Sequence, residues 1–377
     1  MSLQKMNTSV VRGNFTSVGK ETSLSITTQV GMTGAYAIVF VAAIFGNAFV
    51  LHVLRSQRNM RTAFNYLIAN MAIADMIDAV FSIPYLIHML FYDIGWFPGP
   101  FAVVLCKAIN YFMNVSIAVS VLTMAIITVD RYLATVHVLK QPFSLRTVKR
   151  LIFMVWAISS GIYVYEIYKF RVVVLPSKRN VCVPYVSDDR DTTVLYFNVE
   201  MIVKFILTYA IPFTLMASLY TIIIIHLWKR KHIGEGNNDS YRKLKAQKKT
   251  VIIKLVAMVA LFAFCWIPVH VAHFLSTFNT RAKGRIPISL ILVIYWLAHA
   301  NTAINPCIYL MLTKQSRRMI RDSLGSTKKK DFKRKKVAAG SLPAKHASRL
   351  TMKTHLKKKD EVNDISPLCG SQTDTAV

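Results

Sequence analysis

The sequence predicts an all-α membrane protein, in which a bundle of seven transmembrane helices is followed by a short amphipathic eighth helix. The chain has 377 residues, of which 54% are hydrophobic and 17% charged, and its mean hydropathy is +0.39. A soluble domain of average composition carries about 25% charged residues. The apolar residues also gather in seven long runs, and roughly 20 such residues cross a bilayer core as a helix. A soluble enzyme is therefore not the leading interpretation.

The seven apolar runs follow one another along most of the chain, at residues 34–54, 64–90, 101–136, 148–168, 194–228, 250–278 and 286–312. One such run alone is often a buried helix of a soluble protein, but seven in succession argue against that alternative. Backbone polar groups in lipid must be satisfied within the segment, so the runs predict helices rather than open strands. Several runs exceed a bare span, which predicts tilt or extension beyond the lipid.

The basic residues predict a plasma-membrane protein with its amino terminus outside and its carboxyl terminus in the cytoplasm. With that orientation the cytoplasmic segments hold 33 of the 47 Lys and Arg residues, and the external segments hold 11. Excess cations mark cytoplasmic loops. Residues 1–33 then form an extracellular tail, in which Asn7 and Asn14 begin glycosylation acceptor patterns. The bundle with its eighth helix spans residues 34–324, and a basic tail spans 325–377.

Polar residues occur at one position after another inside the predicted helices. Such groups are expensive in a membrane and usually face a bundle interior or a wet cavity. The set comprises Asn47, Asp75, Ser120, Asn301 and Asn305. Carboxylate, hydroxyl and amide oxygens suit Na⁺, and a packing network that joins the helices is an equal alternative.

Three short motifs stand at places where a helix can change shape. The triplet Asp130-Arg131-Tyr132 ends the third run, where the Arg either pairs with its neighbour or meets an incoming partner. A cation that extends to the lipid interface is the simpler alternative. Trp266-Ile267-Pro268 and Asn305-Pro306 place prolines in mid-helix, and proline there kinks a helix and can supply a hinge.

Together these residues resemble the rhodopsin-like class, class A, of G-protein-coupled receptors, over about residues 34–324. The motifs that carry the resemblance are Gly46-Asn47, Ala69-Asn70 with Ala74-Asp75, Trp96, Cys106, Asp130-Arg131-Tyr132, Trp156, Pro212 with Tyr220, residues 262–268 and residues 305–309. Val138 replaces a common proline, and no cysteine lies near Ser323 for palmitoylation. The eighth helix, residues 314–324, must then hold the membrane by its own apolar residues and cations.

The resemblance implies that an external agonist shifts the receptor toward a form with an open cytoplasmic cavity, where a helix of a heterotrimeric G protein docks. In that scheme Phe262 and Trp266 relay occupancy of the ligand site. The remaining switch residues are Asp130, Arg131, Tyr132, Tyr220, Pro268, Asn305, Pro306 and Tyr309. The sodium pocket comprises Asp75, Ser120, Asn301 and Asn305, so an allosteric Na⁺ is the one ion expected. Cys106 and Cys182 both face an oxidising compartment, and the family has a disulfide at these places.

Two single positions restrict the ligand. Amine receptors of this class carry an Asp where this chain has Met113, and opsins carry a retinal-binding Lys where it has His299. Both ligand types are therefore excluded. The family positions for ligand contact, or positions beside them, hold Asp78, Met113, Asn114, Glu200, Lys204, His270, His273, Tyr295 and His299. None of these has a spacing typical of a zinc site.

The charged members of that set leave alternatives open. Asp78 is placed either to meet a ligand cation or to pair with the internal amides. Glu200 and Lys204 are four residues apart on one helix in the favourable order. Mutual neutralisation is therefore favoured over capture of a ligand carboxylate by Lys204.

Residues 171–194 predict a strand pair around Cys182 with a turn at residues 176–180. Asp188, Asp189 and Asp191 follow, and they either attract a cationic ligand or form solvated loop charge. A hairpin over the ligand site is typical of peptide receptors of this class. The leading hypothesis is therefore an extracellular neuropeptide, basic or amidated. A lipid or another small molecule is the alternative within the class.

The tail from Thr327 onward is rich in Lys and Arg and poor in apolar residues, which predicts disorder. Its position favours attraction to anionic membrane lipids over nucleic acid. Its Ser and Thr residues are candidate sites for receptor kinases, and phosphorylation there would recruit arrestin. The final Thr375-Ala376-Val377 resembles a ligand for a PDZ protein. A transporter or a membrane enzyme is a weaker interpretation, because neither an internal repeat nor a catalytic motif is visible.

Overall fold

The structure, a computed structural model of the chain, describes residues 24–56, 62–93, 95–137, 143–229, 239–278 and 286–312. The chain divides into two compact units, residues 1–322 and 323–377. All the described residues belong to the first unit. The acceptors Asn7 and Asn14, the eighth helix and the basic tail lie outside the described residues.

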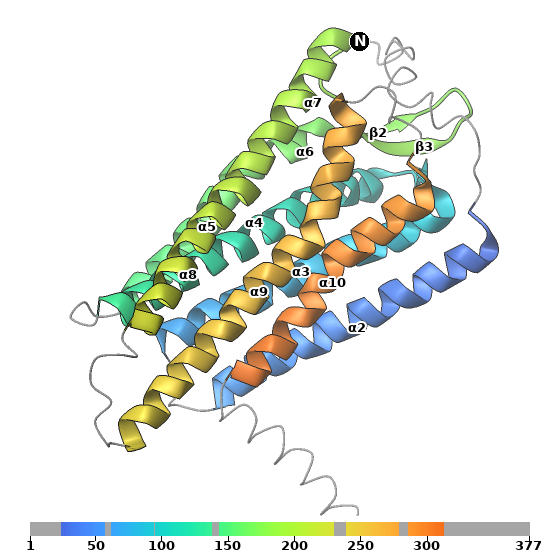
Figure 1. Cartoon of the computed structure of the whole chain (residues 1–377). Helices are drawn as coiled ribbons and strands as arrows, with labels where there is room; N and C mark the ends of the chain where they lie inside the picture. Colours follow the sequence, from blue (N-terminus) through green and yellow to red (C-terminus); the bar gives the residue numbers. More distant parts are fainter. Residues whose placement is uncertain are drawn as a thin grey trace, which may run out of the picture. The chain divides into compact units, whose positions relative to one another are not determined.

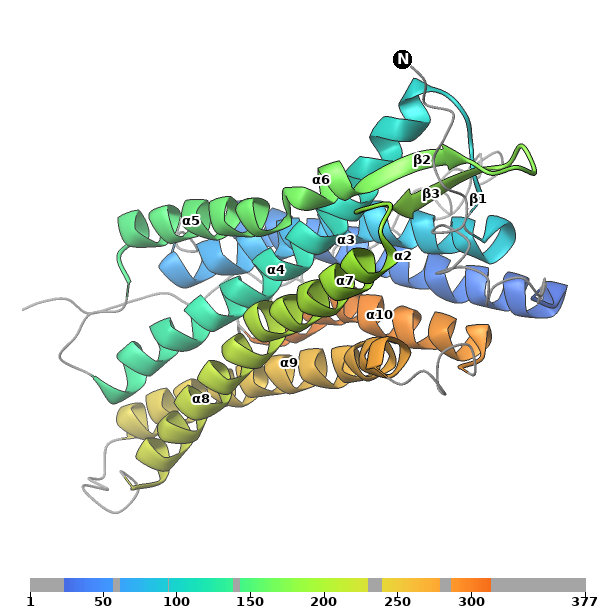
Figure 2. The ribbon, with the colours of Figure 1, turned by 90° about the horizontal axis from the view of Figure 1, so that it is seen from above.

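Seven spans in the described part of the chain are long and apolar enough to cross a membrane, and they run side by side as a bundle (Figures 1 and 2). The predicted fold class is therefore confirmed. Five of the spans each lie within one continuous α-helix: α2 (Ile26–Ser56), α3 (Ala63–Tyr92), α4 (Pro100–Val136), α9 (Asp239–Phe278) and α10 (Ile288–Leu312). The fourth and fifth spans consist of shorter pieces.

Several helices begin at a polar side chain that accepts a hydrogen bond from the first turn. Thr62 Oγ1 accepts from the Asn65 N–H at 3.3 Å, and Ser144 Oγ accepts from the Thr147 N–H at 3.1 Å. Ser25 Oγ accepts from the Thr28 N–H at 3.2 Å before α2. With this cap α2 begins eight residues before the predicted apolar run. Hydropathy indicates only the part of a helix that lies in lipid, so it does not predict where the helix itself begins.

The fourth and fifth spans differ from their predictions as single helices. The fourth consists of α5 (Leu145–Tyr163) and α6 (Tyr165–Lys169), which meet at a turn at Val164. The fifth consists of α7 (Arg190–Phe205), the π-helical segment η3 (Ile206–Ala210) and α8 (Ile211–Lys229). Pro212 has no N–H to donate to the carbonyl of Thr208, so the regular pattern is interrupted at that point.

A small antiparallel sheet lies at the end of the bundle where α4 begins (Figure 2). Strands β2 (Phe170–Val174) and β3 (Asn180–Pro184) pair with Val172 opposite Cys182, which confirms the predicted hairpin. The Leu175 N–H closes the turn on the Arg179 carbonyl at 2.8 Å. A third strand, β1 (Gly95–Trp96), pairs with β3 and was not predicted, because two residues are too short for a periodic pattern.

Helices α2 and α10 approach each other closely at Gly46. A Cβ atom at this position would lie 2.8 Å from Pro306 Cγ, so only glycine fits without a shift of the neighbouring helix. Next to it, Asn47 Nδ2 donates to the Thr302 carbonyl of α10 at 3.0 Å and to the Ala43 carbonyl at 2.9 Å. The close approach therefore brings α2 against the segment of α10 that carries Asn301 and Asn305.

Candidate functional site

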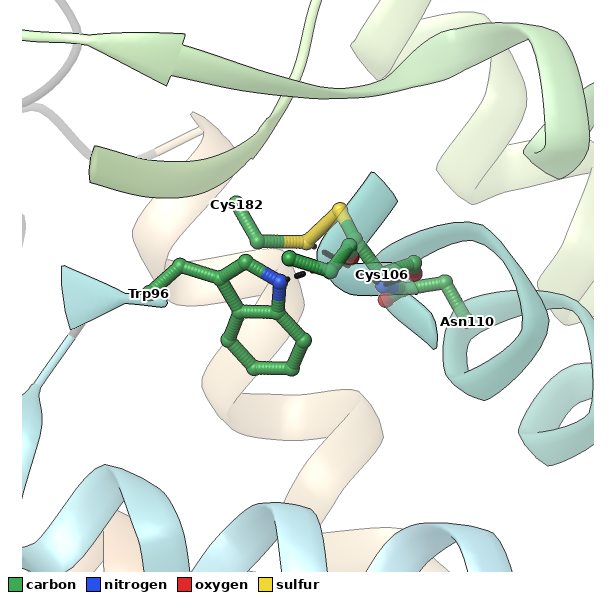
Figure 3. The surroundings of a disulfide bond; sticks show 5 residues. Trp96, Cys106, Asn110 and Cys182 are labelled. Atoms are coloured by element: carbon green, nitrogen blue, oxygen red, sulfur yellow. Dashed lines mark hydrogen bonds between the residues drawn. A yellow bond between two sulfur atoms is a disulfide. The ribbon is translucent and has the colours of Figure 1, made fainter. Parts of the chain in front are cut away.

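The sheet is fixed to α4 by a disulfide bond. Cys106 of α4 and Cys182 of β3 are joined, with their Cα atoms 5.9 Å apart, which confirms the predicted bond. Trp96 Nε1 donates to the Ala102 carbonyl at 2.8 Å, and Asn110 Nδ2 donates to the Cys106 carbonyl at 2.8 Å (Figure 3). These contacts fix the hairpin over one end of the bundle.

One acid of the loop cluster has a structural partner. Asp189 caps α7, where its Oδ2 accepts from the Thr192 N–H at 2.8 Å and from the Thr192 hydroxyl. These hydrogen bonds from Thr192 hold the pKa of Asp189 below its usual value. Attraction of a cationic ligand by Asp188, Asp189 and Asp191 stays a prediction.

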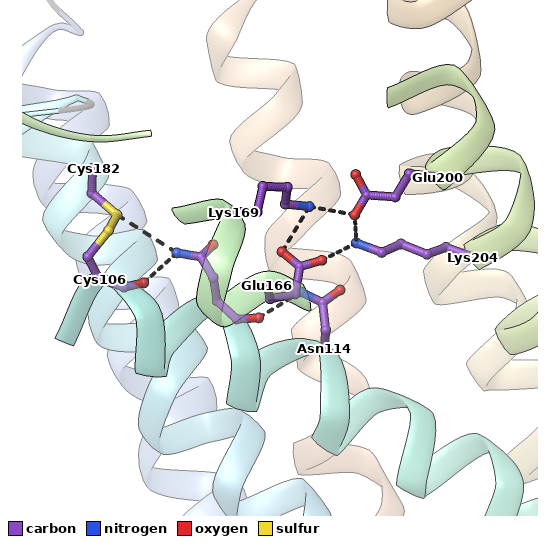
Figure 4. A network of polar contacts seen from close by, with 8 residues as sticks. Cys106, Asn114, Glu166, Lys169, Cys182, Glu200 and Lys204 are labelled. Atoms are coloured by element: carbon purple, nitrogen blue, oxygen red, sulfur yellow. Dashed lines mark hydrogen bonds and ion pairs between the residues drawn. A yellow bond between two sulfur atoms is a disulfide. The ribbon is translucent and has the colours of Figure 1, made fainter. Parts of the chain in front are cut away.

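Two acids and two lysines form a compact ionic group between α6 and α7, which we call the four-charge cluster: Glu166, Lys169, Glu200 and Lys204. Lys169 Nζ lies 2.9 Å from Glu166 Oε2 and 2.5 Å from Glu200 Oε1. Lys204 Nζ lies 2.7 Å from Glu200 Oε1 and also contacts Glu166 Oε1 (Figure 4). Each acid therefore pairs with both amines.

The pairing of Glu200 with Lys204 follows the predicted neutralisation, but the α6 half of the cluster was not predicted. The predicted fourth run ends at residue 168, which places Lys169 in an external loop. A usable signal was present, since Glu166 and Lys169 are opposite charges three residues apart, and such residues are neighbours on a helix surface.

Asp78 and His299 form a buried pair. His299 Nδ1 lies 2.8 Å from Asp78 Oδ2, and Asp78 Oδ1 accepts from the Ser82 hydroxyl at 2.7 Å. Both side chains are buried. The sequence predicts that Asp78 either meets a ligand cation or pairs with the internal amides. In the structure its two carboxylate oxygens contact His299 and Ser82, and contact with a ligand cation stays a prediction.

The other candidate ligand residues lie on α4, α9 and α10. His273 Nε2 and the Tyr295 hydroxyl are 2.8 Å apart and so join α9 to α10. His270 packs against Tyr209, with ring centroids 4.4 Å apart. Asn114 Nδ2 donates to the Asn110 carbonyl of its own helix at 2.8 Å, and Met113 is half-buried.

Asp75 lies at the centre of the buried polar residues. Its Oδ1 accepts from the Ser120 hydroxyl at 2.8 Å, and its Oδ2 accepts from Asn305 Nδ2 at 2.9 Å. The side-chain oxygens of Asn301 and Asn305 are buried without a hydrogen-bond partner among the described residues. A cavity of about 10 Å³ adjoins Asp75, Ser120 and Asn301, which is room for about one water-sized ion. This donor set fits Na⁺.

Two aromatic residues of α9 lie next to this cavity. The rings of Phe262 and Trp266 are stacked with centroids 5.8 Å apart, and Trp266 meets the His299 ring edge-on at 5.9 Å. Pro268 lies inside α9 and Pro306 inside α10. The predicted relay residues are therefore in contact with both the buried pair and the cavity.

At the opposite end of the bundle, Arg131 pairs with the carboxylate of the adjacent Asp130. Asp130 Oδ1 also accepts from the Phe143 N–H at 3.2 Å, and the Arg131 guanidinium lies 4.6 Å from the Phe64 ring centroid. The Tyr132 hydroxyl lies 3.2 Å from His137 Nε2. Arg131 is therefore held against its own helix and the neighbouring α3.

Two further tyrosines of the switch set are buried near this end. Tyr220 of α8 lies in the same buried hydrophobic cluster as Tyr309 of α10. The Tyr309 hydroxyl of α10 donates to Asn65 Oδ1 of α3 at 3.4 Å. The predicted switch residues near this end thus come from α4, α8 and α10.

Comparison with known proteins agrees with this geometry. Residues 46–309 match the family model described as 7 transmembrane receptor (rhodopsin family). A tachykinin-like peptides receptor of Drosophila melanogaster is 31% identical over 291 residues, which cover 75% of this chain and 56% of that relative.

Two further relatives have comparable similarity. The Substance-K receptor of Mus musculus is 31% identical over 287 residues, which cover 75% of this chain and 72% of the relative. The RYamide receptor of Tribolium castaneum is 29% identical over 290 residues, which cover 75% and 77%. The chain therefore belongs to the rhodopsin family of seven-transmembrane receptors.

Proposed function

We propose that this protein is a receptor that binds an extracellular neuropeptide and activates a heterotrimeric G protein. One observation carries the proposal. Trp266, which contacts His299, lines the same buried cavity as Asp75, and Arg131 lies at the opposite end of the same bundle. Two distant sites influence one another when both bias the same packed helices.

A peptide is favoured over a lipid for two reasons. The hairpin is fixed by the disulfide beside the end of the bundle, so polar backbone and loop groups surround the approach to the candidate ligand residues. The relatives are also named for peptides: tachykinin-like peptides, substance K and RYamide. The proposed contacts are Asp78, Met113, Asn114, Glu200, Lys204, His270, His273, Tyr295 and His299, with Asp78 and His299 acting as a buried pair beneath the others.

In the proposed mechanism the agonist favours a conformation that the unliganded receptor rarely adopts. Movement of Trp266 and Phe262 is transmitted through the cavity beside Asp75 to the half of α10 that follows Pro306. Arg131 then leaves Asp130 and contacts the G protein. Tyr220 and Tyr309 line the cavity that opens around it.

A sodium ion would be held by Asp75, Ser120, Asn301 and Asn305 in the inactive form. The bound cation would neutralise the buried carboxylate and use the amide oxygens that have no partner. If the agonist-bound conformation had a smaller cavity, sodium and agonist would favour opposite conformations.

The proposed localisation is the plasma membrane, with the amino terminus outside and the carboxyl terminus in the cytoplasm. The distribution of Lys and Arg supports this orientation, and so does the disulfide at the hairpin end, because disulfides persist in oxidising compartments. Arrestin, receptor kinases, a PDZ protein and anionic lipids are the proposed cytoplasmic partners.

The test is a cell assay with biosensors for each class of G protein. Cells that express the receptor are exposed to a panel containing amidated and free-acid neuropeptides, including the peptides for which the relatives are named. Lipids and nucleotides form separate arms. At least one peptide is expected to trigger a response in receptor-expressing cells and none in cells with the Arg131→Ala variant at equal surface expression. A response only to lipids or nucleotides would overturn the peptide assignment.

A further inference from the structure

The four-charge cluster has properties that its role as a helix contact does not explain. It holds two negative and two positive side chains, and each acid touches both amines. Removing four charges from water is costly, and their attraction usually compensates for that cost without a large surplus. The net charge of the cluster is zero, so it presents no overall field to an approaching ligand.

Exposure divides the cluster into two halves. Glu166 and Lys169 of α6 are 3% and 4% exposed, whereas Glu200 and Lys204 of α7 are 13% and 28% exposed. A ligand can therefore reach the α7 pair but not the α6 pair. Helix α7, which carries Lys204, also contacts α9, which carries His273, where the Thr277 hydroxyl lies 3.3 Å from the Met201 sulfur.

The reachable atoms are one acceptor and one donor. Both ion pairs of Glu200 end on Oε1, as the dashed lines of Figure 4 show, and Oε2 points away from the cluster. The Lys204 ammonium has three N–H groups, and two carboxylates occupy it on one side. Glu200 Oε2 and Lys204 Nζ therefore offer an acceptor beside a donor.

An ionic ligand group gains little at such a surface. A carboxylate would meet Lys204 but also the two acids, and an ammonium would meet Glu200 but also the two lysines, while either loses its hydration. A primary carboxamide carries an N–H donor and a carbonyl acceptor side by side, with no charge to desolvate. Its N–H fits Glu200 Oε2 and its oxygen fits Lys204 Nζ.

We propose that Glu200 and Lys204 form a subsite for a neutral carboxamide of the ligand, and that the buried Glu166 and Lys169 set its selectivity by keeping the cluster neutral. Glu166 and Lys169 are positioning residues that act through the α7 pair. Glu166→Gln gives the cluster a charge of +1, and Lys169→Met gives it −1. The double variant is neutral again, although it keeps only the Glu200–Lys204 pair of the four ion pairs. The inference deepens the proposed function, since it assigns part of the ligand.

The test measures binding of three probes of equal size to the purified full chain in lipid nanodiscs: 3-phenylpropanamide, 3-phenylpropanoate and 3-phenylpropylammonium. Saturation-transfer NMR yields a Kd for each, with empty nanodiscs as the blank. The wild-type receptor is expected to bind the amide about tenfold more tightly than either ion. Glu166→Gln should change the ratio of the amide Kd to the anion Kd about tenfold in favour of the anion. Lys169→Met should change the ratio of the amide Kd to the cation Kd about tenfold in favour of the cation. In each variant one uncompensated charge acts on the probe at short range.

The double variant separates electrostatic selectivity from structural damage. If the net charge of the cluster sets its selectivity, Glu166→Gln/Lys169→Met should bind the three probes in the same order as the wild type. A merely structural cluster predicts that the double variant is at least as impaired as either single variant. Should a single variant fail to fold, the order in which the wild-type receptor binds the three probes still tests the proposal.

Three outcomes overturn the proposal: an ion that binds the wild type best, an order of probes unchanged by both single variants, or no binding above the blank. Failure of the proposed function is a different result. In that case the amide binds selectively while no peptide activates a G protein.

A carboxamide reaches the subsite either from an amidated carboxyl terminus or from an Asn or Gln side chain. For the most potent peptide of the cell panel, the free-acid form tests the first source and Gln→Glu or Asn→Asp replacement tests the second. One of the two changes is expected to lower potency about tenfold in the wild type and by much less in Glu166→Gln.

Discussion

The close approach of α2 to α10 at Gly46 allows a matched pair of glycine substitutions with opposite predicted effects. In Gly46→Ala the new methyl group would lie 2.8 Å from Pro306 Cγ and 3.2 Å from Pro306 Cβ. Ordinary contact begins at 3.4 Å, and a proline ring inside a helix cannot rotate away. One helix must therefore move. Gly34 of the same helix has no heavy atom within 4 Å of the equivalent position.

The magnitudes follow from two terms. Alanine is favoured over glycine in a helix interior by about 1 kcal/mol, and that gain applies at both positions. Overpacking costs about 1–3 kcal/mol and applies at Gly46 alone. Gly34→Ala should therefore stabilise the receptor, whereas Gly46→Ala should destabilise it by up to about 2 kcal/mol, since the two terms partly cancel.

Thermal unfolding of the purified receptor, followed with a thiol-reactive dye in detergent, measures the difference. For a protein of this size about 1 kcal/mol corresponds to roughly 2–4 °C in Tm, so Gly46→Ala should unfold several degrees below Gly34→Ala. A Tm for Gly46→Ala that equals or exceeds that of Gly34→Ala would refute the packing of α2 against Pro306.

Three further predictions test other parts of the structure. Replacing both Cys106 and Cys182 by Ser should lower the free energy of unfolding by about 4 kcal/mol, because the disulfide closes a loop of 76 residues. Reductant should lower the Tm of the wild type and leave the Tm of the variant unchanged. Sodium chloride at ten times the Kd should stabilise the wild type by about 1.4 kcal/mol over choline chloride, and Asp75→Asn should abolish that difference in Tm. The Trp156 indole N–H donates to Asn70 Oδ1 at 2.8 Å. Asn70→Ala leaves this donor without its acceptor and should lower the free energy of unfolding by about 1–3 kcal/mol. Adding Trp156→Phe to the Asn70→Ala variant should restore part of that loss.

The sequence predicts the seven spans well because lipid favours apolar side chains along the whole length of a span. It also predicts the hairpin, since the valine-rich segments 172–175 and 181–186 and the turn between them are local signals. Hydropathy does not predict helix ends that lie outside the lipid. The extension of α9 back to Asp239 crosses a basic segment, where charged residues give no hydropathy signal although they are good helix formers.

The candidate site was only partly predictable, because its pairings join helices that are distant in sequence. Asp78 and His299 are 221 residues apart, and no local pattern indicates that one is the partner of the other. Glu166 and Lys169 were missed because a hydropathy average treats a charge at the end of a run as the start of a loop. Burial of such charges becomes visible only when opposite charges on the next helix, Glu200 and Lys204, are packed against them.

The most direct test of the coupling between the two ends of the bundle is the affinity of the most potent peptide for the receptor in nanodiscs, with and without a nucleotide-free G protein. Coupling between sites is reciprocal, so the G protein should tighten peptide binding by about tenfold or more, and Arg131→Ala should remove the effect. Equal peptide affinity in the presence and absence of every class of G protein would contradict the coupling.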